Sequence, residues 1–415
     1  MKSNLTVKLI AAVFVLFVCE GIARLGLNIF QTNFQQDWRF QDWRFTSVNY
    51  TEVVKQKRSM VEDILLDNGG YIQLDADLGW TVKPNGIEGR PSDGVYNDRL
   101  YQANSDGIRS SHEYQRNPSS DVVRVAVFGD SFSHADDVSN DAAWTAVWEQ
   151  SNSNLEVLNF GVPGFGTDQA YLRYQKEGKE FSPDITVLGI MSENLMRNVN
   201  TFVPFYRPDA WPTSKPRFVF APDGSFTLKE NFFRDRSDYQ ALIDDLPATL
   251  LELGEHDWWY NAKYKPGILD NSSLFQLLHY SYILFRYPWM LDDRSLYKKE
   301  SEHYKILLEI IQRFSKEVEE SGSTPVIVLF PSLEVLEKFR VDGNLMYSPL
   351  LDDLDKQSIR YVDVLDGFTK YGGDVDVRGL IPGHNSVIGN EMAARYINEE
   401  LQVLIESNLT TKQNR

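Results

Sequence analysis

From residue 123 onward, short apolar runs alternate with segments whose apolar residues recur at helical spacing. The apolar runs predict strands at 123–128, 157–160, 185–190, 325–330 and 360–364. The helically spaced segments predict helices at 142–150, 169–180, 296–320 and 334–340, and a last helix near 387–405. Strands that alternate with helices along the chain indicate a parallel sheet with both faces covered.

One long segment, 200–294, interrupts this alternation between the third and fourth predicted strands. It is rich in aromatic residues, namely Phe205, Tyr206, Trp211, Trp258, Trp259, Tyr260, Tyr264, Tyr280, Tyr282, Tyr287 and Trp289. Aromatic side chains build the core of a small subdomain, and they also form walls on which sugars stack. We expect an inserted subdomain with its own core, with a lid or glycan-binding wall as the alternative.

Residues 1–30 have the pattern of a membrane anchor. Two lysines precede the apolar run 9–19, and apolar residues resume after Glu20, interrupted by Arg24. Residues 9–30 can cross a bilayer if Glu20 and Arg24 lie near its outer interface. Because no small-x-small cleavage site is evident, we expect an uncleaved anchor with the lysines inside and the rest of the chain outside the cytoplasm. A cleaved signal peptide of a secreted protein and an amphipathic surface helix are the alternatives.

Two segments lie between this anchor and the first predicted strand of the sheet. Residues 31–68 contain the pentapeptide Gln-Asp-Trp-Arg-Phe twice in tandem, and we interpret them as a stalk with a local duplication. In 69–122, Gly, Asn, Asp and Pro recur between short apolar pieces, which predicts short strands packed on the edge of the main domain. The main α/β domain then comprises 123–199 and 295–407, and 408–415 form a tail.

Composition narrows the range of partners. The chain has 415 residues and a formal net charge of −17. This charge argues against nucleic acid or an anionic lipid surface as the main partner, and it fits neutral or weakly charged substrates. The single cysteine, Cys19, lies in the apolar N-terminal segment, so the rest of the chain has neither a disulfide nor a thiol metal site.

The first predicted strand ends in Gly-Asp-Ser, at 129–131. A buried parallel strand that stops at a tight turn presents Ser131 at the carboxyl edge of the sheet, where open α/β sheets bind their ligands. A nucleophilic serine needs a base that takes its proton and donors that face the oxyanion. Asp130 and Ser131 are also ordinary N-cap residues, so capping of the next helix is the alternative interpretation.

Loops after the other predicted strands offer candidates for these roles. A glycine-rich run follows the second strand, and its Gly164 N–H can face an oxyanion, although left-handed glycine turns explain the same residues. Asn194 follows the third strand and can supply a side-chain amide. His384 lies in a loop before the last helix and is one of six histidines. His134, close to the serine, is a less favoured base that we expect in the following helix or loop.

The order of these blocks resembles the SGNH (GDSL-type) hydrolase family. That family has Gly-Asp-Ser after the first strand, Gly after the second, Asn after the third and His before the last helix. The resemblance covers 123–404, and the flanking Asn104-Ser-Asp-Gly-Ile-Arg109 and Asn194-Leu-Met-Arg-Asn198 resemble a membrane-anchored bacterial branch of the family.

The resemblance implies a flavodoxin-like three-layer α/β/α sandwich with a parallel sheet of about five strands. It implies Ser131 as nucleophile and His384 as base. The Ser131 N–H, Gly164 and Asn194 are then the oxyanion hole, with Asp130 beside the nucleophile. No metal or organic cofactor is implied.

Two positions depart from the pattern of the family. The family usually has Asp three residues before the histidine, and this position is Ile381. The nearest acids in sequence, Asp374 and Asp376, or a backbone carbonyl can orient the ring instead. The third block usually reads Gly-x-Asn-Asp, whereas here it reads Met191-Ser-Glu-Asn194, so the amide position can also fall on Glu193, which cannot donate when ionised.

We therefore expect a membrane-anchored extracytoplasmic serine esterase. It would remove O-acyl groups, acetyl first among them, from a carbohydrate or other small ester. Transfer of the acyl group to a sugar hydroxyl instead of water would make it an O-acyltransferase acting on exported polysaccharide. A catalytically weak glycan-binding assembly factor is the alternative from another class; Ile381 favours it, whereas Ser131 and His384 oppose it.

Overall fold

The computed structural model describes residues 2–34, 55, 57–66, 70–90, 99–265, 267, 269, 271–286 and 296–414. The tandem pentapeptides of the expected stalk lie outside the described residues. Contacts divide the chain into two compact units. The first unit comprises Met1–Leu66, Asn200–Ser214 and Ser237–Leu296, and the second comprises Asp67–Val199, Lys215–Arg236 and Tyr297–Arg415.

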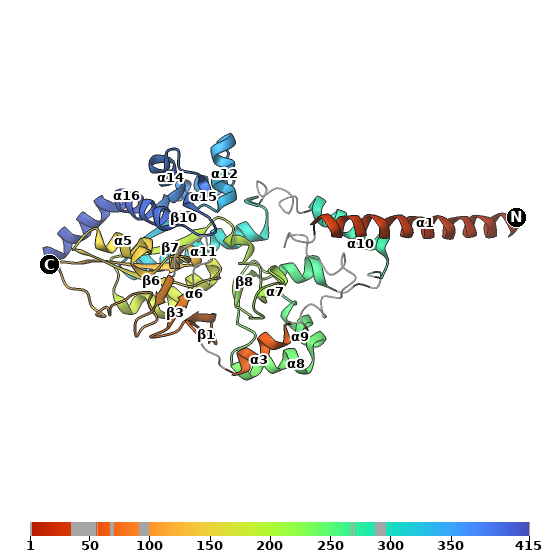
Figure 1. The fold of residues 1–415 in the computed structure, drawn as a ribbon, viewed down its shortest axis with the longest axis horizontal. Coiled ribbons are helices and arrows are strands. Elements are labelled where there is room, and N and C mark those ends of the chain that lie inside the picture. Colours follow the sequence, from red (N-terminus) through yellow and green to blue (C-terminus); the bar gives the residue numbers. More distant parts are fainter. Residues whose placement is uncertain are drawn as a thin grey trace. The chain divides into compact units, whose positions relative to one another are not determined.

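The second unit is built around a five-stranded sheet (Figure 1). Its strands are β5 (Val123–Gly129), β6 (Leu155–Gly161), β7 (Ile185–Met191), β10 (Thr324–Phe330) and β11 (Tyr361–Asp363). Their order in space is β11-β10-β7-β5-β6, and every pairing is parallel. Both β5 and β7 are buried along their whole length, as in sheets covered on both faces. The predicted strands and the flavodoxin-like class are confirmed, since this is the 2-1-3-4-5 order of that fold.

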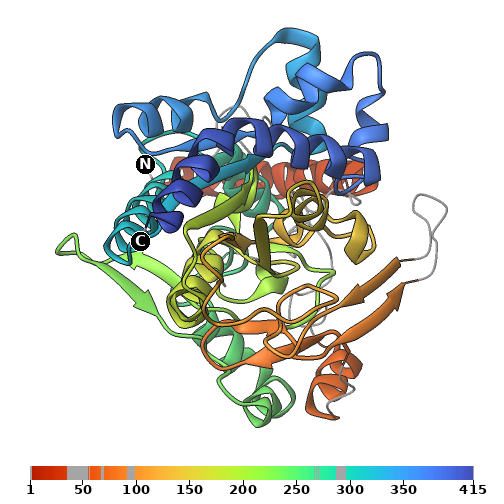
Figure 2. The same cartoon turned by 90° about the vertical axis from the view of Figure 1, so that its left-hand side faces the viewer.

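Two separate sets of helices form the outer layers (Figure 2). One layer contains α5 (Trp144–Gln150), α14 (Val364–Gly372) and α16 (Val387–Gln413), which pack on one another and on the sheet. The other layer contains α6 (Thr167–Glu177) and α11 (Glu302–Glu320). Shorter helices, α12 (Leu333–Asp342), α13 (Ser348–Lys356) and α15 (Val377–Leu380), connect the last strands and helices.

Two helix boundaries differ from the sequence prediction. Helix α11 begins at Glu302 rather than at 296, because the Ser301 hydroxyl accepts a hydrogen bond from Tyr304 N–H and caps the helix there. Helix α16 continues to Gln413, so most of the expected tail is helical. Lys412 holds this end of the helix by donating to Val122 O and to Asp184.

The expected edge extension consists of two antiparallel hairpins. They are formed by β1 (Ile72–Asp75) with β2 (Gly79–Val82), and by β3 (Ile87–Arg90) with β4 (Arg99–Gln102). Three residues of this extension are buried: Tyr71 directly before β1, Tyr101 within β4, and Arg109 after β4. The extension therefore sends polar side chains into the second unit rather than only covering its surface.

The first unit contains the N-terminal helix and most of the aromatic insert. Its helices include α1 (Lys2–Phe34), α3 (Arg58–Leu66), α7 (Val203–Tyr206), α8 (Ala241–Asp244), α9 (Leu246–Leu253) and α10 (Ser273–Arg286). Among the described residues, α1 is the one helix that is long and apolar enough to cross a membrane, over Thr6–Ile29.

Aromatic residues of the insert form a core in this unit. Phe205 contacts Tyr260 and Tyr264, while Tyr206 contacts Trp259, and all five side chains are buried. Residues 215–236, with the hairpin β8 (Arg217–Phe220) and β9 (Phe226–Lys229), belong to the second unit instead. The expected insert 200–294 is thus divided between the two units.

Candidate active site

Ser131 lies at the point where the winding of the sheet changes direction. The chain passes from β5 to its neighbour β6 and then crosses to β7 on the other side of β5. Ser131 follows β5 directly and begins the short helix α4 (Ser131–His134). Open α/β sheets bind their ligands at this kind of switch point, so the serine occupies the position where a substrate would be bound.

Close packing of α4 against the strand ends explains two glycines. A Cβ at Gly129 would lie 1.9 Å from Ser133 Oγ, and one at Gly161 would lie 2.3 Å from His134 N. The second contact is with backbone, which cannot turn away. These glycines therefore let the nucleophile turn sit directly against β5 and β6.

Asp130 caps α4 and is fully buried. Its Oδ1 accepts from Phe132 N–H at 2.8 Å, and its Oδ2 accepts from Asn194 Nδ2 at 2.6 Å. Burial raises the pKa of Asp130 above its ordinary value, although the Arg197 charge and these two hydrogen bonds oppose the rise. The capping interpretation is thus correct for Asp130.

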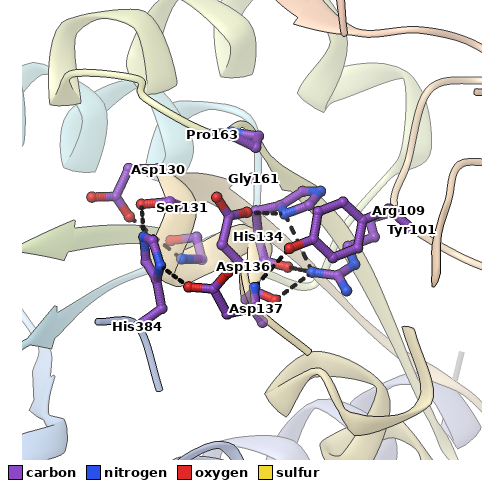
Figure 3. A network of polar contacts seen from close by, with 12 residues as sticks. Tyr101, Arg109, Asp130, Ser131, His134, Asp136, Asp137, Gly161, Pro163 and His384 are labelled. Carbon is purple, nitrogen blue, oxygen red and sulfur yellow. Dashed lines mark hydrogen bonds and ion pairs between the residues drawn. The ribbon is translucent and has the colours of Figure 1, made fainter. Parts of the chain in front are cut away.

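Ser131, His384 and Asp137 are joined by two hydrogen bonds (Figure 3). Ser131 Oγ lies 3.0 Å from His384 Nε2, and Asp137 Oδ2 lies 2.7 Å from His384 Nδ1. The imidazole rests against the Phe132 ring, with 5.2 Å between ring centroids. Its side chain is 28% exposed, so solvent and substrate can reach it. This is the geometry of a nucleophile, a base and an orienting acid.

The carboxylate that contacts His384 is not one of the acids closest to it in sequence. Asp376 caps α15 by accepting from Arg378 N–H, and Ile381, at the position of the usual family acid, is buried. Asp137 instead comes from the nucleophile loop, six residues after Ser131. Two residues of that loop, Ala135 and Asp137, have positive φ angles of 64° and 70°. These left-handed conformations turn the chain back so that Asp137 faces the histidine.

His384 is tuned toward the protonated state. Burial of the ring lowers its pKa, but the hydrogen bond to Asp137 and the charges of Asp136, Asp137 and Asp130 outweigh burial. The pKa of His384 therefore lies above its ordinary value of 6.5. An imidazole that gains stability on protonation is a stronger acceptor for the serine proton.

A buried arginine holds the nucleophile loop, which sequence reasoning did not identify as part of the site. Arg109, which is 5% exposed, donates to three successive parts of the loop: His134 O, Ala135 O at 2.6 Å and Val138 O at 2.6 Å (Figure 3). It lies in the block Asn104–Arg109, whose resemblance to the membrane-anchored branch was its only sequence signal.

His134 and its neighbours complete this support. As expected, His134 ends α4 and is buried rather than placed as a base. Its Nδ1 lies 2.5 Å from Asp136 Oδ1, and its Nε2 lies 2.9 Å from the Tyr71 hydroxyl. The Tyr101 hydroxyl accepts from Asp137 N–H at 2.7 Å. The edge extension thus fixes the backbone on both sides of the orienting acid.

Two backbone N–H groups are available for an oxyanion. Within the described part of the chain, neither Ser131 N–H nor Gly164 N–H donates to a protein acceptor. Gly164 has a positive φ of 82° and lies beside the Trp80 ring. A Cβ added at Gly164 would lie 3.5 Å from this ring. Trp80 Nε1 also donates to Pro163 O at 2.9 Å, which holds the glycine turn in place.

Asn194 is the member of the third block that reaches the nucleophile turn. Its Nδ2 donates to Asp130, and its Oδ1 is buried with no hydrogen-bond partner among the described residues. Glu193 precedes this short 3-10 turn. The structure therefore brings the amide, and not the Glu193 carboxylate, to Asp130. The amide carries a second hydrogen, which is the one that the predicted role in the oxyanion hole would require.

The described residues contain no group of three or more His, Cys, Asp or Glu side chains that could hold a metal ion. The groups that meet at the carboxyl edge are a hydroxyl, an imidazole, a carboxylate and N–H donors. This set is suited to acyl transfer through a serine ester.

No family model and no curated protein matches the chain. A member of the lipolytic protein G-D-S-L family from Veillonella parvula is 11% identical with a TM-score of 0.34, and the match covers 67% of this chain and 97% of that chain. A catalytic mutant of an acetylxylan esterase from Geobacillus stearothermophilus is 12% identical with a TM-score of 0.35, covering 67% and 94%. An alpha/beta hydrolase enzyme from the metagenome of Lake Arreo, Spain, is 12% identical with a TM-score of 0.36, covering 68% and 96%.

Proposed function

We propose that this protein is a serine ester hydrolase of the SGNH type, with Ser131 as nucleophile, His384 as base and Asp137 as the acid that orients the base. The observation that carries the proposal is the continuous chain of hydrogen bonds from Asp137 through His384 to Ser131 Oγ. Asp137 supplies the carboxylate that Ile381, at the usual position of the family acid, does not provide. The main reason to favour a catalytically weak assembly factor is thereby removed.

The reaction follows from these positions. Ser131 Oγ attacks the acyl carbonyl carbon while its proton passes to His384 Nε2, and the carbonyl oxygen becomes an oxyanion facing Ser131 N–H and Gly164 N–H. The ester C–O bond then breaks, and His384 returns the proton to the leaving alcohol. Water attacks the acyl-serine with His384 again as base, which releases the acid and restores Ser131. A sugar hydroxyl in place of water would give acyl transfer.

The substrate that fits the chain is a neutral or weakly charged O-acylated carbohydrate or small ester, with acetyl as the acyl group. The net charge of −17 disfavours polyanionic substrates. An enzyme anchored by α1 with its second unit outside the cytoplasm would act on envelope or exported glycans. Acetylated and longer-chain esters, compared at equal concentration, test the acyl group.

A fluorophosphonate probe tests the nucleophile. The full chain and its Ser133→Ala variant should be labelled and should hydrolyse aryl acetate, whereas Ser131→Ala should do neither. Ser133 is a matched control because it lies in the same short helix, is buried and has a hydroxyl with no hydrogen-bond partner in the described structure. A folded wild-type protein that is not labelled and turns over no acetyl ester would exclude the esterase.

A further inference from the structure

Helix α1 has two parts that differ in their surroundings. Every residue of 6–18 is exposed. From Cys19 onward one stripe is covered, and Ala23 and Leu27 on it are only 2% and 5% exposed. The covering element is α10, which packs against α1 within the first unit (Figure 1).

The length of the exposed part is too short for a bilayer. At 1.5 Å per residue, 6–18 extends for about 20 Å, whereas the hydrocarbon core is about 30 Å thick. If α1 crosses the membrane over Thr6–Ile29, the hydrocarbon core must extend past Cys19 into the part that α10 covers. The N-terminal end of α10 is then at membrane depth as well.

Glu20 is the polar group that this placement must account for. Its carboxylate accepts from Ser272 Oγ at 2.8 Å, Ser273 N–H at 2.5 Å and Leu274 N–H at 3.0 Å. The first N–H groups of a helix have no partner inside the helix, and a carboxylate in an apolar medium needs donors. Glu20 and the start of α10 therefore satisfy each other, which explains an acidic residue inside an apolar segment.

The outward side of α10 is largely apolar, and the hydroxyl of the exposed Ser281 donates to Leu277 O of the same helix. Leu278, Tyr282 and Phe285 recur at helical spacing and are 61%, 59% and 86% exposed, whereas Ile283 on the opposite side is 2% exposed. On α1, Ile22 and Leu25 at the same level are also exposed. Together these side chains continue the apolar surface of the span onto the second helix.

We propose that α10 is embedded in the outer leaflet beside α1, with Leu278, Tyr282 and Phe285 facing lipid. The inference rests on α1 being a membrane span and is independent of ester hydrolysis. The occupant is lipid because the face is continuous with the span. Insertion of α10 would be driven by burial of apolar side chains and would not require anionic lipid. This agrees with the net charge of −17, which disfavours attraction to an anionic lipid surface. A segment so engaged is also part of the folded protein and not a leader that is removed.

Depth-dependent fluorescence quenching tests this placement. Full-length protein carrying Cys19→Ala, which removes the single cysteine, receives one new cysteine at a time by Leu278→Cys, Phe285→Cys, Val13→Cys or Lys316→Cys. Each is labelled with an environment-sensitive fluorophore in phosphatidylcholine vesicles that contain acyl-chain nitroxide lipids. Val13 in the span and Lys316 on α11, whose side chain is 76% exposed, are the lipid and water references.

The labels at 278 and 285 should be quenched, as the label at 13 is, while the label at 316 is not quenched. Anionic lipid should leave this pattern unchanged. Labels at 278 and 285 that behave like the one at 316 would overturn the proposal, whether water or a second copy covers them. An unquenched label at 13 would overturn it too, because α1 would then not be a span.

The contact at Glu20 provides a second test. Glu20→Ala removes the acceptor and should release α10, so that quenching at 285 falls while quenching at 13 is kept. Glu20→Gln keeps one acceptor oxygen and should retain more of the quenching at 285. Equal quenching in all three proteins would show that the capping contact does not hold α10 in the bilayer.

Discussion

At the scale of single residues, the site depends on the hydrogen bonds and charges around the imidazole of His384. His384 has a proton acceptor role only if Nε2 is free of its proton and directed at Ser131. In the proposed mechanism Asp137 secures this by accepting a hydrogen bond from His384 Nδ1–H, with 2.7 Å between Oδ2 and Nδ1. Two further carboxylates, Asp136 and Asp130, are not needed for this orientation, because their charges raise the pKa of His384 without a hydrogen bond to the ring.

Asp137→Asn should lower kcat on aryl acetate by about 10³–10⁴-fold, as expected when the orienting acid of a serine triad is replaced by its amide. The physical reason is that the amide can present an N–H to the imidazole and select the wrong tautomer. Steady-state kinetics of the full chain measure this. Asp376→Asn, which alters a helix cap away from the ring, should change kcat by less than about 3-fold and serves as the control. A larger loss in Asp376→Asn than in Asp137→Asn would contradict the assignment.

The pH profile follows from the sign of the shift at His384. The base must be neutral, and its pKa is raised above 6.5, so kcat/KM should rise with pH and level off only above that value. Asp137→Asn removes a contribution that raises the pKa, so its residual activity should reach its plateau at lower pH. Rates measured from pH 5 to pH 9 decide this. A wild-type profile that levels off below pH 6.5 would contradict it.

At the scale of elements, the nucleophile loop is held from outside by the edge extension. Residues 134–138 include two left-handed positions, which cost free energy unless neighbours stabilise them. Arg109 from the extension donates to carbonyls on either side of these positions. The extension thus holds the loop that carries Asp137, the proposed orienting acid, although none of its side chains contacts Ser131 or His384 among the contacts described above.

Arg109→Lys should reduce kcat by on the order of 10-fold with little change in KM, because a single ammonium cannot reach the carbonyls that the guanidinium fork joins. It should also lower the free energy of unfolding by about 2 kcal/mol, as buried carbonyls lose charged donors. Urea denaturation and kinetics measure the two effects. Arg313→Lys, on the exposed side of α11, is the control and should alter neither. Wild-type kcat and stability in Arg109→Lys would refute the positioning role.

At the scale of the whole molecule, the chain consists of a catalytic unit and a unit that joins the aromatic insert to the N-terminal helix. Glu20 on α1 bonds to residues some 250 positions later in the chain. This contact favours an uncleaved anchor over a removed signal peptide. Most aromatic residues described in the insert lie in the core of the first unit, which agrees with the expected subdomain core more than with a sugar-stacking wall.

The mature protein in the membrane fraction should therefore retain its N-terminal helix. Intact-mass measurement of the purified chain should give the mass of the full sequence, apart from processing of Met1. A soluble protein with the mass expected after loss of residues 1–30 would contradict the anchor. A cytoplasm-dependent reporter fused after Arg415 should be inactive, because the lysines before the span favour an outside C-terminus.

The strands, most helices, Ser131 and His384 were predictable from the sequence because they depend on local patterns. Apolar residues recur every few positions on the buried face of a strand or helix. Gly-Asp-Ser indicates the end of a strand because these residues favour turns and helix caps. Even the missing family acid at Ile381 was visible. Helices α13 and α14 were not predicted, and α11 was placed too early because Leu296 and Tyr297, which lie before its cap, extend the apolar pattern.

Other features depend on which distant segments pack together. Asp137 is oriented by two left-handed residues and by Arg109, and neither influence has a local signature. The division of the insert at 215–236 and the pairing of Glu20 with α10 likewise join positions far apart in the chain. A side chain's partner is set by the packing of whole elements, whereas the elements themselves are set by the periodicity of their own residues. The candidate nucleophile and base could therefore be proposed from the sequence, but Asp137, on the far side of His384 from Ser131, could be recognised as the candidate acid only in the folded chain.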